Sequence, residues 1–339
     1  MRKFICVIFT EKKKYFSGTA FPMVSRAEEA SKSFNKIILN QMNIFNRLMV
    51  GTIELLPKKL VRVFANKYIA GDKIEEAIQK VRELNDKKML ATMDVLGESI
   101  KNKDEAIQSK NESIEVLESI NKTGINSNLS VKLTLIGLTI DYELCKSLVT
   151  EILECAKSYN NFVRIDMEDS PVTDLTIKMY EDMRKKFDNV GLVFQSYMRR
   201  TEKDILRLVK EKSNFRLCKG IYIEPESIAF KKRNEVRDNY LKLLRIIFEN
   251  KTYVGIATHD DYLIEKAKEM IDEFGLTKND YEFQMLLGVR EKARDKIVSE
   301  GHKMRIYVPF GERWYQYSIR RFKENPNMAG QVIKSIFVR

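Results

Sequence analysis

The first quarter of the chain carries the spacing of apolar and polar residues that is typical of amphipathic helices. Residues 25–49 form one long stretch of this kind. A second helix is predicted from Pro57 through Ala70, because proline suits the first helical turn and the residue after Ala70 is a glycine. A third is predicted over 73–86, where the apolar residues form one stripe. We therefore expect a helical segment over residues 1–87.

From residue 88 onward the pattern changes to an alternation of short apolar runs with helical stretches. The apolar runs have strand character and lie at 89–95, 131–136, 162–165, 190–195, 215–218, 253–257, 281–286 and 304–308. The helical stretches lie at 101–121, 141–158, 171–187, 201–212, 225–250, 260–274, 289–300 and 312–324. Such alternation of strands and helices predicts a parallel sheet.

Eight strand–helix units fit the α/β fold class, as a closed (β/α)8 TIM-type barrel, which typically takes about 250 residues. We expect this barrel to occupy residues 88–339, with the helices of residues 1–87 packed on it. A doubly wound open sheet is the alternative architecture. That class usually carries a glycine-rich nucleotide loop, and the sequence contains neither GxGxxG nor a Walker A motif.

Polar residues stand at seven of the eight predicted strand ends, where barrels of this class place their chemistry. They are Lys132, Arg164, Asp166, Gln195, Arg216, Lys219, Thr258, His259, Glu282, Gln284, Arg305 and Tyr307. Buried ionic groups are costly unless they are paired, so the simplest explanation is a large polar ligand over the barrel mouth. Plainer explanations exist for single residues. Lys132 can pair with Asp166 across neighbouring strands, His259 can be a hydrogen-bonded turn histidine or a helix cap, and Gln195 can bond strand backbone.

The last predicted helix, 312–324, has a polar face that includes two adjacent arginines. That face carries Tyr317, Arg320, Arg321 and Glu324, and the opposite face carries Tyr315, Ile319 and Phe322. Guanidinium groups bind carboxylates in a planar, bidentate manner, so the arginine pair can hold a small carboxylate. The alternative is an ordinary amphipathic helix whose polar face lies in water.

The chain has 60 basic and 48 acidic side chains, and its net charge of +12 would suit an anionic partner. The basic residues are interleaved with acidic ones, without a dense basic tract, so direct nucleic-acid binding is not expected. Attraction to an acidic membrane surface fits better. No apolar run approaches the ~20 residues that span a bilayer, and the run at residues 4–9 is short for a signal sequence. We expect a cytoplasmic protein, with peripheral attachment to the inner face of the membrane as an option.

The cysteine and histidine content argues against a metal site. The cysteines are Cys6, Cys145, Cys155 and Cys218, and none forms a CxxC pair. The chain has two histidines, which is too few for the usual zinc ligand sets, so we expect no bound metal. At 44% hydrophobic and 32% charged residues, the composition is that of a globular chain, and its thiols are expected to be free in a reducing compartment.

Seven short motifs follow one another in the barrel region and beyond it. They begin at Asp94 (DVLGE), Arg164 (RIDME), Arg216 (RLCKGIY), Ala257 (ATH), Tyr281 (YEFQ), Arg305 (RIYVP) and Arg320 (RRFKEN). In this order they resemble the proline dehydrogenase family, the flavin enzymes that open proline catabolism, and the chain is similar to the monofunctional bacterial form. The resemblance implies a (β/α)8 barrel that binds FAD at the carboxyl ends of its strands, which agrees with the absence of a Rossmann glycine motif.

The resemblance also implies a set of cofactor-binding residues. Arg216 would lie near the flavin N5, and Gln195 would hydrogen-bond the isoalloxazine ring. Lys219 and Gly220 would contact the ribityl and phosphate region. The other expected FAD contacts are Tyr222, Thr258, His259, Gln284, Met285 and Glu324. A cation near the flavin ring would tune its chemistry, and charged donors would satisfy its phosphates.

The same resemblance implies a site for proline. Arg320 and Arg321 would hold the proline carboxylate, with Lys132 as a third cation. Asp166 would orient these cations by pairing with Lys132 or Arg321. The catalytic set is thus Lys132, Asp166, Tyr307, Arg320 and Arg321, and the wall against the proline ring includes Leu286 and Tyr317.

The implied reaction is the oxidation of L-proline to 1-pyrroline-5-carboxylate by hydride transfer to flavin N5. Electrons would pass on to a quinone-type acceptor, and a downstream aldehyde dehydrogenase could take the product. A flavin barrel of the methylenetetrahydrofolate reductase type is a rival, but the double arginine favours a small amino acid over a folate. A non-catalytic flavin-binding or scaffold barrel is the alternative from another class. The combination of Lys132, Asp166 and the arginine pair argues against it.

Overall fold

A computed structural model of the chain describes residues 58–97, 100–209, 213–315 and 317–319. All of them belong to one compact unit that spans Leu56–Glu324. The amphipathic stretch predicted at 25–49 lies outside the described residues, and so does the part of the last predicted helix beyond residue 319.

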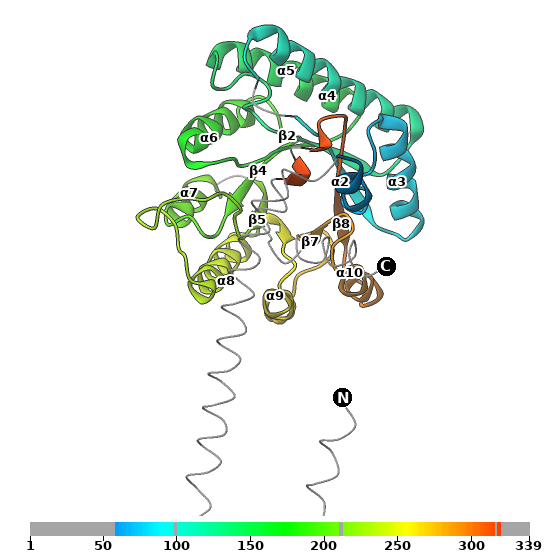
Figure 1. The fold of residues 1–339 in the computed structure, drawn as a ribbon. Coiled ribbons are helices and arrows are strands. Elements are labelled where there is room, and N and C mark those ends of the chain that lie inside the picture. Colours follow the sequence, from blue (N-terminus) through cyan, green and yellow to red (C-terminus); the bar gives the residue numbers. More distant parts are fainter. Residues whose placement is uncertain (1–57, 98–99, 210–212, 316, 320–339) are drawn as a thin grey trace, which may run out of the picture. The chain divides into compact units, whose positions relative to one another are not determined.

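Eight parallel strands close into a barrel in the order of the chain, with β8 beside β1. The strands are β1 (Leu90–Val95), β2 (Ser127–Val131), β3 (Val163–Ile165), β4 (Val190–Gln195), β5 (Asn214–Cys218), β6 (Tyr253–Ala257), β7 (Tyr281–Leu286) and β8 (Met304–Phe310). Figure 1 shows these strands inside a ring of helices. The closed ring confirms the predicted barrel and excludes the open doubly wound sheet, because β1 and β8 are neighbours rather than edges.

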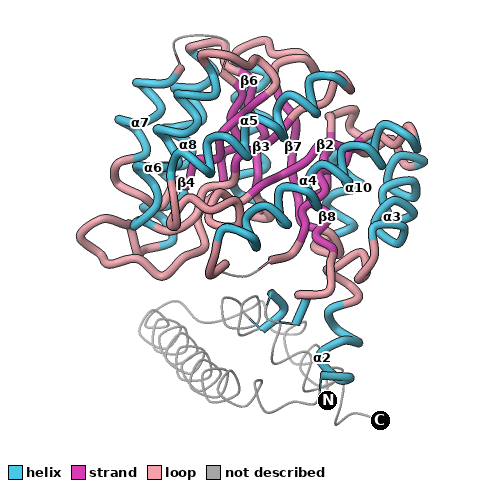
Figure 2. Tube along the Cα trace, turned by 90° about the horizontal axis from the view of Figure 1, so that it is seen from above, coloured by secondary structure: helices cyan, strands magenta, loops and turns pink. Residues whose placement is uncertain are grey.

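Helices connect consecutive strands along the outside of the barrel (Figures 1 and 2). The helices between consecutive strands are α4 (Lys103–Thr123), α5 (Tyr142–Ser158), α6 (Ser170–Arg184), α7 (Thr201–Leu208), α8 (Arg233–Glu249), α9 (Asp261–Glu273) and α10 (Glu291–Ser299). Two further helices, α2 (Lys58–Ala65) and α3 (Ile74–Asp86), precede β1. None of these helices, nor any other in the described part of the chain, is long and apolar enough to cross a membrane.

Local signals set the ends of the connecting helices. The side chain of Asn102 accepts a hydrogen bond from Glu105 N at 2.9 Å at the start of α4, and Gly124 ends that helix with φ +65°. Asp141 caps α5 in the same way, accepting from Leu144 N at 3.1 Å. These caps satisfy backbone groups that a helix leaves unpaired, and so they fix where the chain turns back towards the barrel.

The apolar core lies between the strands and the ring of helices. Alternate strand residues such as Met93, Ile165 and Phe215 are completely buried on the outer face of the barrel. They pack against the apolar stripes of the helices, for example Leu148 and Ile152 of α5. The other face of each strand points into the barrel, where most side chains are polar.

The second strand lies earlier in the chain than its apolar run predicted. β2 ends at Val131, and residues 133–140 form consecutive turns. In these turns Leu135 N–H bonds Lys132 O at 3.1 Å, and Ile136 N–H bonds Leu133 O at 3.0 Å. The run looked like a strand because Leu133 and Ile136 are buried in the core, although the backbone turns there. Lys132 therefore follows the strand instead of opening it.

The start predicted for α8 was also wrong, because residues 225–232 precede the helix as an irregular loop. The carboxylate of Glu224 accepts hydrogen bonds from the backbone N–H and the hydroxyl of Ser170, both at 2.7 Å. Ala229 forms an isolated bridge with Met198. Residues 226–228 form a turn in which the N–H groups of Ile228 and Ala229 both bond Pro225 O at 3.1 Å. These contacts hold the segment in an irregular path, and the helix begins only after it.

Residues 314–319 are helical apart from residue 316, which is not described, and they lie beside α2 at the carboxyl end of β8 (Figures 1 and 2). The Arg62 guanidinium lies over the Trp314 ring, with its Cζ 4.7 Å from the ring centroid. Tyr317 packs against Ala65 and Ile69. α2 ends at Ala65, earlier than predicted, whereas α3 agrees with its predicted range. The division of the chain at residue 87 stays a prediction.

Candidate active site

A pocket of about 290 Å³ opens among the carboxyl ends of the strands. Every predicted site residue that the structure describes lines it. These are Lys132, Asp166, Gln195, Arg216, Lys219, Gly220, Tyr222, Thr258, His259, Gln284, Met285, Leu286, Tyr307 and Tyr317. The remaining three, Arg320, Arg321 and Glu324, lie outside the described residues, so the expected carboxylate clamp stays a prediction.

Several strands place pairs of polar side chains, two residues apart, inside the barrel. The pairs are Thr92 and Asp94 on β1, Asn128 and Ser130 on β2, Arg164 and Asp166 at β3, Glu282 and Gln284 on β7, and Arg305 and Tyr307 on β8. Residues two apart on a strand share one face. Branched aliphatic side chains more often fill such barrels, so the polar interior calls for a functional or structural explanation.

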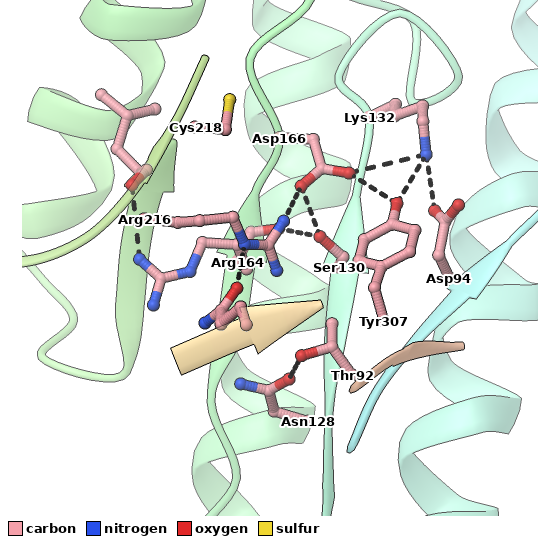
Figure 3. A network of polar contacts seen from close by, with 12 residues as sticks. Thr92, Asp94, Asn128, Ser130, Lys132, Arg164, Asp166, Arg216, Cys218 and Tyr307 are labelled. Carbon is pink, nitrogen blue, oxygen red and sulfur yellow. Dashed lines mark hydrogen bonds and ion pairs between the residues drawn. The ribbon is translucent and has the colours of Figure 1, made fainter. Parts of the chain in front are cut away.

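Asp166 is the centre of a polar network at the carboxyl ends of the strands (Figure 3). We call this the carboxyl-end network; its members are Asp94, Ser130, Lys132, Asp166, Arg216 and Tyr307. Asp166 Oδ1 accepts hydrogen bonds from Arg216 Nη1 at 2.8 Å and from Ser130 Oγ at 2.6 Å. Its Oδ2 accepts from the Tyr307 hydroxyl at 2.8 Å. Donors from three different strands therefore fix the direction of this carboxylate.

Lys132 is shared between two carboxylates. Its Nζ lies 2.7 Å from Asp94 Oδ1 and 3.6 Å from Asp166 Oδ2, and it donates to the Tyr307 hydroxyl at 3.2 Å. The expected contact between Lys132 and Asp166 is therefore present. The nearer partner is Asp94, to which the sequence assigned no role, and among the described residues Arg216 supplies the guanidinium that bonds Asp166.

Burial and mutual attraction act in opposite directions on the ionisable groups of this network. Burial raises the pKa of Asp94, and the charge of Lys132 offsets this only in part. Burial alone would also raise the pKa of Asp166, but Arg216 and Lys132 hold it below its usual value. Burial alone would lower the pKa of Lys132, yet Asp94 and Asp166 keep it above its usual 10.5. Lys132 and Asp166 are therefore both charged at neutral pH.

Three residues that the sequence grouped with the strand ends lie elsewhere. Arg164, Glu282 and Arg305 line a second polar cavity at the amino ends of the strands, together with Asn214. We call these four residues the amino-end cluster. Arg164 Nη1 donates to Asn214 O at 2.7 Å and to Leu192 O at 3.3 Å, and Arg305 Nε donates to Glu282 Oε1 at 2.7 Å. The three charged residues each stand two positions before a residue of the pocket, so they share its face of the strand but lie deeper in the barrel.

Two uncharged polar side chains of the pocket wall already have partners within the barrel. Gln195 Nε2 donates to Glu168 O at 2.9 Å, a backbone bond as in the alternative considered for it, but to the loop after β3 and not to a strand. His259 Nε2 accepts a hydrogen bond from Leu286 N at 3.0 Å. Each side chain thus has a fixed orientation at the pocket before any ligand arrives.

The chain leaves β5 through Lys219 and Gly220. Gly220 has φ +106°, a conformation that residues with side chains rarely adopt, and a Cβ there would lie 2.0 Å from Tyr197 Cδ1. Tyr197 N–H also bonds Lys219 O at 2.9 Å. Glycine therefore allows the chain to press against Tyr197, which brings Lys219 and Tyr222 to the pocket wall.

Asp260, just beyond the end of β6, gathers three cations. Its carboxylate lies 2.6 Å from Arg237, 3.4 Å from Lys219 and 3.6 Å from Arg233. Its side chain is 1% exposed, and burial alone would raise its pKa. The hydrogen bond from Arg237 and the other two cations instead hold that pKa at about 2. One carboxylate among three cations leaves a positive region, which suits an anionic ligand group.

The sequence interpretation assigned no role to Asp94, although it opens one of the motifs, or to Asp260, Arg233 and Arg237. A signal for Asp94 was available, because Thr92 and Asp94 alternate with buried apolar residues along β1, as polar pairs do on other strands. No comparable signal exists for Arg237. It lies on α8 and reaches Asp260 only because that helix packs beside α9 in the folded chain.

A closed (β/α)8 barrel with a charged, partly apolar pocket at its strand carboxyl ends is the architecture of an α/β-barrel enzyme. A sequence model of the family described as proline dehydrogenase matches residues 77–334. The chain therefore belongs to the proline dehydrogenase family, as its motifs indicated, and it is an oxidoreductase that acts on proline.

Individual relatives agree with this assignment. The chain is 39% identical over 275 residues to proline dehydrogenase 2 of Bacillus subtilis (strain 168), a match that covers 81% of this chain and 91% of the relative. It is 32% identical over 289 residues to proline dehydrogenase of Deinococcus radiodurans, covering 84% and 93%. Among solved structures it is similar to proline utilization A (PutA) from Bdellovibrio bacteriovorus inactivated by N-propargylglycine. That match has a TM-score of 0.74 and 25% identity, and covers 79% of this chain and 33% of the other.

Proposed function

We propose that the protein oxidises L-proline to 1-pyrroline-5-carboxylate with FAD as its cofactor, as the first step of proline catabolism. The observation that carries the proposal is the meeting of all described candidate residues in one pocket of a chain that belongs to the proline dehydrogenase family. FAD bound there would supply the hydride acceptor, its N5, for the hydrogen on the proline ring carbon beside nitrogen.

The donor set on the β4–β7 side of the pocket fits an isoalloxazine ring. Gln195, Arg216 and Gln284 present amide and guanidinium groups, and Val193 and Met285 provide apolar surface between them. A flat heteroaromatic ring with polar edges needs this combination of apolar faces and hydrogen-bonding groups. We assign to Arg216 a place near N5, where its positive charge would favour a negatively charged reduced ring.

The positive region around Asp260 fits the pyrophosphate of the cofactor. Lys219, Arg233 and Arg237 converge there, and one carboxylate cannot neutralise all three. Thr258 and His259 stand at the end of the same strand and line the pocket. These residues would hold the phosphate and ribityl portion, because charge-assisted hydrogen bonds to phosphate are among the stronger polar contacts in proteins.

The β8–β1–β2 side of the pocket is left for proline. Lys132 is held by Asp94 and Asp166, so its charge is largely compensated before any substrate binds. We propose that Lys132 positions the substrate carboxylate, while the full countercharge comes from Arg320 and Arg321. Because Asp166 contacts both Lys132 and Arg216, it would fix the position of the substrate-binding cation relative to the cofactor-binding one.

The protein would need little acid–base machinery if the proline amine loses its proton before the hydride moves. The residues would then act by positioning, which can supply several kcal/mol of the barrier. Tyr307 and Leu286 would form the wall against the ring methylenes, and Tyr317 would close the pocket from the helical segment that follows β8.

The test is a titration of the purified protein. We expect a yellow protein whose flavin absorbance bleaches under anaerobic conditions on addition of L-proline, and does not bleach with NADH. The variant Arg321→Met should keep its flavin and show a sharply raised KM for proline. A protein that takes up no FAD, or one that NADH bleaches and proline does not, would overturn the proposal. An unchanged KM in Arg321→Met would remove the clamp alone.

We further propose that a membrane quinone reoxidises the enzyme and that a separate aldehyde dehydrogenase consumes the product. The net charge of +12 supports a peripheral attraction to anionic lipid. Proline-dependent reduction of a quinone analogue should therefore rise when anionic vesicles are present and should not rise with neutral vesicles. Equal rates with both kinds of vesicle would argue against the membrane contact.

A further inference from the structure

A continuous line of hydrogen bonds joins the pocket to the amino end of the barrel. Arg216 Nε donates to Gln284 Oε1 at 2.6 Å, and Gln284 Nε2 donates to Glu282 Oε1 at 2.6 Å. Arg305 Nε donates to the same Glu282 oxygen at 2.7 Å. The line therefore runs from a pocket cation through one amide to an ion pair that lies outside the pocket.

The groups at its two ends determine which way the Gln284 amide points. An ionised carboxylate can only accept hydrogen bonds, and a guanidinium can only donate them. The Gln284 NH2 must therefore face Glu282, which leaves the carbonyl oxygen to face Arg216. With the amide reversed, oxygen would meet oxygen at one end and N–H would meet N–H at the other. Glu282 thus favours the same orientation as Arg216 does, and it holds the amide oxygen where Arg216 can donate to it.

The surroundings leave the amide little freedom. Gln284 is 6% exposed, Glu282 1% and Arg216 7%, so water cannot easily replace a lost partner. Gly255 on β6 lies beneath the amide, and a Cβ at that position would stand 2.3 Å from Gln284 Nε2. Glycine at this point of β6 provides the space in which the amide bridges β5 and β7.

We infer that Glu282 is a positioning residue for Arg216, acting through the Gln284 amide from outside the pocket. The inference rests on the proposed function, in which Arg216 lies beside the flavin ring. Without Glu282 the amide NH2 loses its acceptor and one of the two contacts that hold the side chain in place. Arg216 keeps its bond to Asp166 through Nη1, while the Gln284 oxygen that accepts from its Nε is held less firmly. The guanidinium can then pivot about the bond to Asp166, and its charge is held less firmly beside the ring.

The variants must separate this role from ordinary destabilisation. Removing Glu282 alone would leave Arg305, a partly buried cation, without a carboxylate partner, which destabilises a protein whatever else it does. The double variant Glu282→Leu/Arg305→Leu removes both charges together and still deprives Gln284 of its acceptor. Glu282→Gln is the conservative variant, because its amide oxygen can accept from both donors. Thr92→Val is the matched control, since it removes a buried hydrogen bond to Asn128 that does not touch this line.

The measurement is the reduction potential of the bound flavin. In the double variant we expect the redox equilibrium to shift about tenfold against the reduced form, which is about 30 mV for a two-electron couple, with little change in the KM for proline. Glu282→Gln should stay within about twofold of the unmodified protein, and Thr92→Val should lower Tm without moving the potential. A double variant with an unchanged potential, or an equal shift in Thr92→Val, would overturn the inference.

A second readout does not depend on the flavin. The Nε–H resonance of Arg216, identified by its loss in Arg216→Lys, should move in the flavin-free double variant and stay in place in Thr92→Val. A resonance that does not move would overturn the inference even if FAD binds. If the unmodified protein binds no FAD while this resonance responds as expected, the proposed function fails and the positioning of Arg216 by Glu282 stands.

Discussion

The carboxyl-end network and the amino-end cluster occupy the same barrel and are both polar and largely buried, yet their charges are balanced in different ways. The carboxyl-end network pairs two carboxylates, Asp94 and Asp166, with two cations, Lys132 and Arg216, and most of these groups line a pocket. The amino-end cluster holds one ion pair, and its other cation, Arg164, is bound by neutral groups.

The difference is visible in the pKa values. Burial lowers the pKa of Arg164 to about 9, because its hydrogen bonds to Asn214 and to backbone carbonyls do not supply a full opposite charge. In the carboxyl-end network the opposite charges overcome burial at Asp166, whose pKa is lowered, and at Lys132, whose pKa is raised, although burial still raises the pKa of Asp94. Polarity alone therefore does not mark the functional end of this barrel. What distinguishes the carboxyl end is that Lys132 and Arg216 each have a carboxylate partner, whereas Arg164 is bound by neutral groups.

The largest effect on activity is expected from Asp166→Asn. The substitution keeps the shape of the side chain and removes the charge that holds Arg216 and Lys132. The loss of more than one charge-assisted hydrogen bond should lower kcat/KM about a hundred- to a thousandfold. Steady-state kinetics with proline and an artificial acceptor measure this. A loss below about fivefold would mean that Asp166 is no more functional than the amino-end cluster.

The matching test at the amino end is Asn214→Leu, which should affect stability and not activity. It removes the side-chain oxygen that accepts from Arg164 Nη2 and leaves a buried cation with one partner fewer. We expect the free energy of unfolding to fall by about 3 kcal/mol, while kcat and KM stay within about twofold. Denaturant unfolding and kinetics on the same preparation check both halves. Activity lost in step with stability would break the distinction between the two ends.

The stability of the protein in acid should depend on the ionisation of Asp260, which lies beside the pocket. Its folded pKa of about 2 lies below the ordinary 3.8, so its ionised form stabilises the fold above pH 3.8 and this contribution is lost as pH falls through about 2. Asp260→Asn should therefore cost about 2 kcal/mol at neutral pH. Urea unfolding should show the gap between the two proteins closing in acid. A gap that persists at pH 2 would mean that shape, and not charge, is the cause.

The smallest effect is expected from Tyr307→Phe. The hydroxyl donates to Asp166 at 2.8 Å and accepts from Lys132 at 3.2 Å, and both partners keep other contacts. We expect kcat/KM to fall about tenfold, on the order of one hydrogen bond. Tyr240→Phe is the control, because its hydroxyl donates to Leu217 O at 2.9 Å away from the pocket. The control should lower Tm and leave kinetics unchanged, and equal kinetic losses would contradict the special place of Tyr307.

Periodicity predicted the barrel well because outer strand faces and helix stripes are both apolar and of ordinary length. Periodicity failed where buried residues lie in turns or loops instead of in strands or helices. Leu133 and Ile136 are buried in turns, so an apolar run was taken for a strand. The loop at 225–232 has helix-forming residues, yet the contact of Glu224 with Ser170, which lies far from it in the chain, holds the segment in an irregular path.

The sequence by itself determined the alternation of elements, the family motifs and the residue types that meet in the pocket, because these follow from local spacing. Which charge faces which partner was decided only in three dimensions. Asp94 is the closer of the two carboxylate partners of Lys132. Arg164 lies in the amino-end cavity, whereas Asp166, two positions later, lines the pocket at the carboxyl end. The physical reason is that closing the barrel brings together side chains from distant strands. Their hydrogen bonds and charges are then set by a few ångströms of position that no spacing along the chain contains.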